Sequence, residues 1–265
     1  MNAEDFAARL VASLQGQGEK KNKDWWEKYL KHVISFHGIP MAKLRALVDS
    51  FWSKSSLGSS SSIELKKDVA FELWKCKFSE EKLSGTLIYE KLVSELTLDD
   101  VAKYFATALR AGYLCDWNNV DWLCMKVLGR LVARGRDFCE AIAHWTMNDA
   151  EPIWLRRAGV VAFVWIASKR NYEGFAELVL TAAANNLKSQ ERFIQTGTGW
   201  TLRELGKASQ EKVVLFIEER VQNFTREGVR YAVEKMPAKV KQKLLRLHQE
   251  QFSKSKRAKL RDEEV

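Results

Sequence analysis

Trp117-Asn-Asn-Val-Asp121 is the first of three stretches that combine a tryptophan with a charged residue; the others are Trp154-Leu-Arg-Arg157 and Trp200-Thr-Leu-Arg203. Each pair is three or four positions apart, which puts both side chains on one face of a helix. The tryptophans are 37 and 46 residues apart, about the length of a two-helix repeat. Because equivalent positions of stacked repeats fall along one surface, the stretches predict a track of aromatic rings, arginines and one carboxylate.

The rest of the chain also has helical spacing. Pro40, Pro152 and Pro237 each stand where a helix could begin, and Ser79-Glu-Glu-Lys82 has the pattern of a helix start. No stretch alternates apolar and polar residues over the length of a strand, and no hairpin signal is present. We therefore predict an all-α fold of about a dozen helices, arranged as an α-solenoid of about six HEAT-like repeats with a concave face.

The positive charge is concentrated near the C-terminus. The 265 residues include 43 Lys and Arg against 34 Asp and Glu, and residues 239–261 hold nine basic residues and one acidic residue. We predict a repeat domain over residues 1–238, with a flexible serine-rich loop at 53–62, followed by a basic helix or tail over 239–265. Its last basic segment, residues 254–261, is expected to be either a solvated helix end or a segment for nuclear targeting or DNA contact.

Cysteine spacing and the N-terminus limit the possible class of protein. The four cysteines form no CxxC pair and the four histidines are scattered, so we expect free thiols, no metal and no cofactor. The first residues lack the basic and apolar regions of a signal peptide, and the longest apolar run, residues 158–167, is too short to span a bilayer. We expect an intracellular, soluble monomer that does not bind a membrane.

Each charged residue of the track has a structural alternative. Asp121 could be a catalytic carboxylate, or it could cap a helix or pair with an arginine. Arg157 and Arg203 could bind phosphate through their planar forks, or they could pair with carboxylates such as Glu204.

Several tryptophans and glycines are expected to serve packing. Trp74, Trp145 and Trp165 lie among apolar neighbours, so we predict that they are in the core. Thr196-Gly-Thr-Gly199 lacks the pattern of a phosphate loop. Its glycines either let two helices pack closely or let a ligand approach.

Four segments in a fixed order carry a family resemblance. They are Tyr29-Leu-Lys-His-Val-Ile-Ser-Phe-His-Gly-Ile-Pro40, Trp117-Asn-Asn-Val-Asp121 with Val127-Leu-Gly129, Trp154-Leu-Arg-Arg157 and Gly199-Trp-Thr-Leu-Arg-Glu204. Between about Tyr29 and Lys235 the chain resembles the DNA alkylation repair family, of the HEAT-like alkylpurine DNA glycosylase type.

The resemblance implies a DNA glycosylase of base excision repair. Its substrate would be duplex DNA with cationic alkylated purines of the 3-methyladenine and 7-methylguanine type. The DNA would bind on the concave face, and the N-glycosidic bond of the lesion would be hydrolysed without base flipping. At the reaction centre the resemblance implies Asp121 as the catalytic aspartate, with Trp117 and Trp200 flanking the sugar. The residues implied for the DNA-facing groove are Tyr29, Arg157 and Arg203. Trp154 is then expected to serve packing.

Two positions depart from the family pattern. The family usually has an acidic residue where this chain has Asn118, and a lysine where it has Thr196. Two other functions therefore stay open: a catalytically silent HEAT-repeat protein that binds distorted or branched DNA, and a protein-binding adaptor. The basic tail would favour the nucleus in a eukaryote, whereas a bacterial protein would be cytoplasmic.

Overall fold

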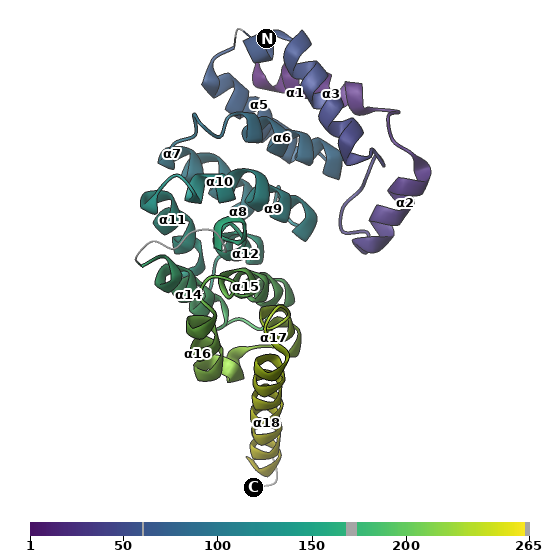
Figure 1. Cartoon of the computed structure of the whole chain (residues 1–265). Coiled ribbons are helices and arrows are strands. Elements are labelled where there is room, and N and C mark those ends of the chain that lie inside the picture. Colours follow the sequence, from purple (N-terminus) through teal and green to yellow (C-terminus); the bar gives the residue numbers. More distant parts are fainter. Residues whose placement is uncertain (60, 168–173, 263–265) are drawn as a thin grey trace. The chain divides into compact units, whose positions relative to one another are not determined.

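The computed structural model describes residues 1–59, 61–167 and 174–262, with only the backbone for residues 254–262. Every regular element in these ranges is helical (Figure 1), and an isolated β-bridge joins Ser35 to Phe78. The predicted all-α fold is confirmed. The helical segments outnumber the predicted dozen because π-helical and 3-10 turns interrupt several longer helices. Within the described ranges, no helix is both long and apolar enough to cross a membrane.

The chain forms two compact units, Met1–Leu131 and Val132–Val265. The helical elements of the first unit are α1 (Ala3–Leu14), α2 (Lys20–Tyr29), α3 (Met41–Lys54), α4 (Ser56–Ser59), α5 (Ile63–Lys75), α6 (Ser79–Lys91), α7 (Leu98–Asp100), η1 (Val101–Ala106), α8 (Thr107–Arg110), α9 (Trp117–Leu123), η2 (Cys124–Leu128) and, reaching the boundary, α10 (Gly129–Val132). The segments η1 and η2 are π-helical, and η2 begins one turn after Asp121.

The core of the first unit forms where α5 and α6 lie side by side (Figure 1). Trp74 is fully buried there, as predicted; its Nε1 donates to Thr86 Oγ1 at 3.2 Å and its ring stacks on Tyr89 at 4.7 Å. Gly85 permits this packing, because a Cβ at that position would lie 2.5 Å from the carbonyl oxygen of Ala70. An indole in a dry core is stabilised when its N–H has an acceptor, as it has here.

Most of the serine-rich segment at residues 53–62, predicted as a flexible loop, is helical. Helix α3 continues to Lys54, and Ser56–Ser59 forms the short helix α4. The physical reason is Leu57, whose side chain is fully buried and fixes α4 against the unit. Residue 60 lies outside the described residues.

The second unit is also helical throughout its described residues. Its elements are α11 (Arg136–Ala143), η3 (His144–Thr146), α12 (Ile153–Val161), α13 (Val164–Ala167), α14 (Phe175–Asn186), α15 (Arg192–Leu205), α16 (Gln210–Arg220), η4 (Val221–Asn223), α17 (Arg226–Ala232) and α18 (Ala238–Asp262). The helix starts predicted at Pro40, Pro152 and Pro237 are confirmed, because α3, α12 and α18 each begin at the next residue.

Helix α15 is packed closely on both sides. A Cβ at Gly197 would lie 2.9 Å from Nη1 of Arg157 on α12. A Cβ at Gly199 would lie 2.5 Å from the carbonyl oxygen of Gly228 and 2.8 Å from Cβ of Tyr231, both on α17. Of the two roles predicted for these glycines, close helix packing is the one that the structure shows.

The first half of α18 packs within the second unit. His248 Nε2 lies 2.9 Å from the carbonyl oxygen of Phe224, Lys243 pairs with Glu218 at 2.5 Å, and Leu244 is buried. The side chains of the predicted basic tail at 254–261 lie outside the described residues, although the helical backbone continues through them.

One prediction for a core tryptophan is wrong. Trp145 is buried as predicted, whereas Trp165 is 37% exposed. Trp165 lies in α13, whose other residues, Val164, Ile166 and Ala167, are buried. An apolar run predicts burial of a short helix but not which of its residues faces solvent.

Replacing Gly199 by alanine is expected to destabilise the protein, because the added methyl group would press on the backbone of α17. Overpacking of this kind costs about 1–3 kcal/mol. Urea unfolding followed by circular dichroism measures the change. The matched control is Gly206→Ala at the end of the same helix, where the nearest atom to a Cβ is 3.3 Å away. Equal stability of the two variants would contradict the close approach of α15 and α17.

Candidate functional site

The candidate site of the first unit is built on α9, which begins at Trp117 because Asp116 caps it. The buried Asp116 carboxylate accepts hydrogen bonds from the Asn119 backbone N–H at 3.0 Å and from Asn119 Nδ2 at 2.8 Å. Burial raises the pKa of the Asp116 carboxyl. Asp121, one turn after Trp117, is therefore not the cap of this helix, and both of these residues are half-buried.

Two buried asparagines fix α9 to the start of α6. Nδ2 of Asn118 and Nδ2 of Asn119 lie 3.2 and 3.1 Å from Oγ of Ser79, which is also buried. Asn118, which departs from the family pattern, thus has a structural partner. Its amide donates to Ser79, whereas an acidic side chain there would accept the hydroxyl proton of Ser79.

The structure brings Tyr29 and Trp117 together. Their ring centroids are 5.7 Å apart with planes at 86°, an edge-to-face contact. Trp117 and Trp26 both pack against a small buried cluster. The members of that cluster are Leu30, Ile34 and Phe36. Two of the residues predicted from widely separated segments are therefore neighbours in one unit.

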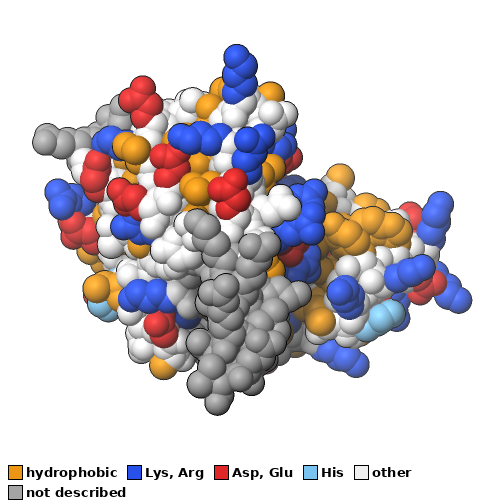
Figure 2. All heavy atoms as spheres, turned by 90° about the horizontal axis from the view of Figure 1, so that it is seen from below, with side chains coloured by type: hydrophobic (Ala, Val, Ile, Leu, Met, Phe, Trp, Pro, Cys, Tyr) orange, Lys and Arg blue, Asp and Glu red, His pale blue; other side chains and the backbone are white. Residues whose placement is uncertain are grey.

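An exposed aromatic pair extends from this contact. Trp25 and Tyr29 stack with centroids 4.9 Å apart and planes at 20°, yet each is 56% exposed. They belong to α2, which has no buried residue and carries four lysines. On the right of Figure 2, the side on which α2 lies in Figure 1, hydrophobic side chains gather with Lys and Arg side chains around them.

Sequence periodicity did not single out Trp25 or Trp26. A usable signal was present, because Trp25 and Tyr29 are spaced i,i+4 on a helix that is otherwise mostly polar. Rings on such a helix have no core to enter, so they remain at the surface.

The segment after α2 is held by the first turn of α6. Glu80 is 2% exposed, and its carboxylate accepts the backbone N–H groups of His37, Gly38 and Ile39 at 2.9, 2.7 and 3.0 Å. The carboxylate of Glu81 lies 3.0 Å from His37 Nε2. These bonds fix the chain between Tyr29 and α3 against the helix that also holds α9.

Gly38 is required at the centre of this attachment. Its φ of +88° lies in the left-handed region, and a Cβ there would lie 2.3 Å from the carbonyl oxygen of Glu19. The backbone N–H of Glu19 donates to the carbonyl oxygen of Gly38 at 3.0 Å. The start of α2 is thereby tied to the same loop.

A group of cations surrounds the residue that follows Asp121. Arg45 and Lys126 lie 5.6 and 5.4 Å from the ring centre of Trp122. Glu90 pairs with Arg45 and with Arg130, each at 3.0 Å. Lys126 lies 4.0 Å from the same carboxylate, so three cations from different helical segments surround Glu90 beside Trp122.

In the second unit, Arg157 is directed into the helix packing. It is 5% exposed, and its Nη1 donates to the carbonyl oxygen of Phe193 at 2.6 Å and to Thr196 Oγ1 at 3.4 Å. Thr196, the second departure from the family pattern, thus accepts a hydrogen bond from an arginine where a lysine would repel it. Trp154 lies 4.9 Å from the ring of Phe193, a packing contact.

Arg203 lies on α15 one turn after the half-buried Trp200 and contacts two carboxylates. Its Nε donates to Glu204 Oε1 at 3.0 Å and its Nη1 to Glu234, and the side chain is 19% exposed. The hydrogen bond from Arg203 lowers the pKa of Glu234. These contacts are the carboxylate pairing named as the structural alternative for this arginine.

Tyr29, Trp117 and Asp121 belong to the first unit, whereas Arg157, Trp200 and Arg203 belong to the second. Among the described side chains, no group of three or more His, Cys, Asp or Glu is placed to hold a metal ion.

An all-helical protein with exposed aromatic rings beside basic side chains has the features of a nucleic-acid-binding protein. Comparison with known families is more specific: the model of the DNA alkylation repair enzyme family matches residues 10–236. The chain therefore belongs to the DNA alkylation repair enzyme family.

A solved structure and the curated proteins give two further results. The chain is similar in fold to a predicted DNA alkylation repair enzyme from Enterococcus faecalis, with a TM-score of 0.72 and 22% identity over 85% of this chain and 99% of that chain. At this identity the likeness shows the fold alone. No curated protein matches the chain.

Replacing Glu80 by alanine is expected to destabilise the first unit, because three backbone N–H groups would lose their acceptor. A buried donor left without a partner costs about 1–3 kcal/mol, so the summed loss should exceed that of an ordinary surface substitution. Urea unfolding followed by tryptophan fluorescence measures it.

The matched variant is Glu80→Gln, whose side-chain oxygen can still accept part of these bonds. It should lose less stability than Glu80→Ala. Equal stability of Glu80→Ala and the unchanged protein would show that the loop is held by other contacts.

Proposed function

We propose that the protein is a DNA glycosylase that hydrolyses the N-glycosidic bond of cationic alkylated purines in duplex DNA, as a step of base excision repair. Family membership supports a role in the repair of alkylated DNA. The observation that carries the proposal is Asp121 on α9, one turn from Trp117, whose ring contacts the exposed Tyr29. The substrates would be of the 3-methyladenine and 7-methylguanine type.

One carboxylate is sufficient for this reaction. A 3- or 7-alkylated purine already carries positive charge, so it departs as a neutral base when its bond to C1′ of the sugar breaks and takes the electron pair. Sugar hydrolysis ordinarily needs a general acid as well as a second carboxylate, and here the acid is unnecessary. An ionised Asp121 would stabilise the oxocarbenium-like sugar and accept the proton of the water that attacks C1′.

The aromatic rings would recognise the positive charge of the lesion. We propose that Trp117 and Trp200 present indole faces to the cationic base and to the electron-poor sugar. A well-placed cation–π contact contributes about 0.5–2 kcal/mol. The edge-to-face contact with Tyr29 and the buried cluster behind it would keep the Trp117 ring in one orientation.

We propose Tyr29 and Arg203 as direct DNA contacts. Phosphate would compete with Glu234 for the guanidinium of Arg203, and a carboxylate and a phosphate both suit its planar fork. Arg157 stays a predicted DNA contact, and its bonds to Phe193 and Thr196 on α15 also fix the helix that carries Trp200 and Arg203.

We further propose that Trp25 takes part in DNA binding. Stacked on Tyr29 and 56% exposed, its ring offers a flat face in the midst of lysines. Stacking of a base or sugar on such a face needs no base-specific hydrogen bond. As the family resemblance implies, the helical pairs would be HEAT-like repeats whose concave surface meets the lesion without flipping it.

Replacing Asp121 by asparagine is expected to lower base release from methylated duplex DNA by roughly a hundredfold or more, because the negative charge at the transition state is lost. DNA binding should survive, since the substitution keeps the size of the side chain and removes no positive charge. Base release is measured by chromatography of free methylpurines, with Asp99→Asn, an exposed carboxylate of the same unit, as the control.

The outcomes separate the candidate functions. Unchanged release by Asp121→Asn would refute the assigned catalytic residue. If the unchanged protein releases no base but binds DNA with strong salt dependence, it is the silent DNA-binding protein. A protein-binding adaptor would show no preference for DNA at either of two salt concentrations.

Replacing Trp25 by alanine is expected to weaken binding of methylated duplex DNA about fivefold or more, because one stacking surface is lost. Folding stability should change little, since the ring is largely exposed. Fluorescence anisotropy measures the affinity. Trp25→Phe should retain most of it, and Leu215→Ala, which removes another exposed apolar side chain, is the control. An effect of the same size in Leu215→Ala would contradict a specific role for Trp25.

A further inference from the structure

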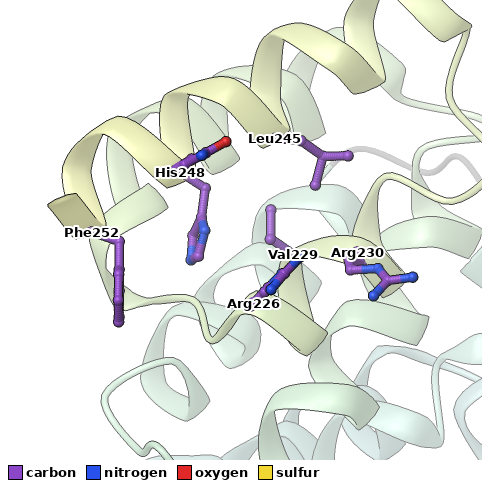
Figure 3. Close-up of a pocket in the computed structure, with 7 residues that line it drawn as sticks. Arg226, Val229, Arg230, Leu245, His248 and Phe252 are labelled. Carbon is purple, nitrogen blue, oxygen red and sulfur yellow. The ribbon is translucent and has the colours of Figure 1, made fainter.

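A cavity of about 400 Å³ lies between α17 and α18 in the second unit. Arg226, Val229 and Arg230 line it from α17, and Leu245, His248 and Phe252 line it from α18 (Figure 3). Helix α18 begins at Ala238, beyond residues 10–236 that match the family. This cavity is therefore partly formed by a helix that the family match does not include.

The cavity combines an apolar floor with a charged rim. Val229 is fully buried, and His248 is held by its contact of 2.9 Å with the carbonyl oxygen of Phe224. Phe252 is 68% exposed, and Figure 3 shows its ring and that of His248 extending from α18 on the side of α17. Arg226 and Arg230 are exposed and spaced i,i+4, so they share a face of α17.

A second cavity of about 700 Å³ adjoins the first, because Arg230 and Leu245 line both. Its lining also includes Arg203, Tyr231 and Lys241. We call the two neighbouring cavities together the α17–α18 groove. It leads from Phe252 to Arg203, the arginine already proposed to contact DNA.

Positive charge predominates in the α17–α18 groove. Its two carboxylates are engaged: Glu227 is bound by Arg192 through two bonds of 2.7 Å, and Glu234 by Arg203. Within the part of the chain whose side chains are described, no ion pair within 4.0 Å joins Arg226, Arg230 or Lys241 to a carboxylate. Arg230 and Lys241 attract the carboxylates of Glu227 and Glu234 only over a longer distance. The three cations therefore keep their hydrogen-bond donors for an anionic ligand.

We propose that the α17–α18 groove binds the phosphate backbone of DNA. Guanidinium groups on one helix face can each bind a phosphate with two hydrogen bonds. Phe252 would lie against a sugar or base edge beside them. The continuity of the groove with Arg203 favours DNA over an acidic peptide, and in this respect the inference depends on the proposed function.

The test compares the double variant Arg226→Ala, Arg230→Ala with a control that removes two exposed lysines elsewhere in the unit, Lys188→Ala and Lys212→Ala. The affinity for an undamaged duplex is measured over a range of salt concentrations. Each lost phosphate contact should reduce the slope of log K against log salt by about 0.9, so the arginine variant should lose roughly 1.8. Its affinity at low salt should fall about tenfold or more, with the control unchanged.

Two further measurements make the result specific. Arg226→Lys with Arg230→Lys keeps both charges, so it should keep most of the salt slope. A photo-reactive phenylalanine analogue at position 252 in the full chain should cross-link to duplex DNA. Circular dichroism of each variant, compared with the unchanged protein, checks that the helix content of the chain is kept.

The inference is overturned if the arginine-to-alanine variant keeps the salt slope and affinity of the control. It is also overturned if the probe at position 252 cross-links to a second copy or an acidic protein and not to DNA. Failure of the glycosylase proposal is distinguishable, because it would appear as absent base release with the groove still binding DNA. If the protein releases base but the arginine variant keeps the salt slope, only the proposed role of the groove is refuted.

Discussion

The first unit depends on one buried carboxylate. Glu80, in the first turn of α6, accepts three consecutive backbone N–H groups of residues 37–39. Those amides would otherwise be buried without partners, and the positive end of the helix dipole favours the negative charge. The side-chain amides of Asn118 and Asn119 on α9 donate to Oγ of the neighbouring Ser79. The two halves of the candidate site, Tyr29 and Trp117, are thus positioned from the same turn of one helix.

The sequence pattern predicted where helices begin better than it predicted which side chains are buried and what they contact. Ser79-Glu-Glu-Lys82 was correctly predicted as a helix start, because the Glu81 carboxylate accepts the backbone N–H of Phe78 within the first turn. That all four of these polar side chains are buried could not be predicted, since their partners are far along the chain. Lys82, for example, donates to the carbonyl oxygens of Trp74 and Tyr113.

The same limit applies to the candidate site residues. Helical spacing placed Trp117 and Asp121 on one face correctly, because both lie on α9. Spacing could not decide whether Arg203 binds a phosphate or a carboxylate, and only the fold shows Glu234 beside it. The exposed Trp25 was not singled out at all, because a tryptophan is ordinarily expected in a core. Burial is a property of the whole fold, whereas spacing is a property of one helix.

The π-helical segment η2, directly after α9, separates Asp121 from the rest of its helix. A π-helical turn holds one residue more than an α-helical turn, so the side chains on either side are out of α-helical register by about 100°. Such segments are frequent at functional sites. Side chains beyond η2, such as Arg130, therefore face a direction that an unbroken α-helix through Asp121 would not give them. The directions of the side chains before and after η2 are therefore set separately, so that a change in one part of this helix need not rotate the other.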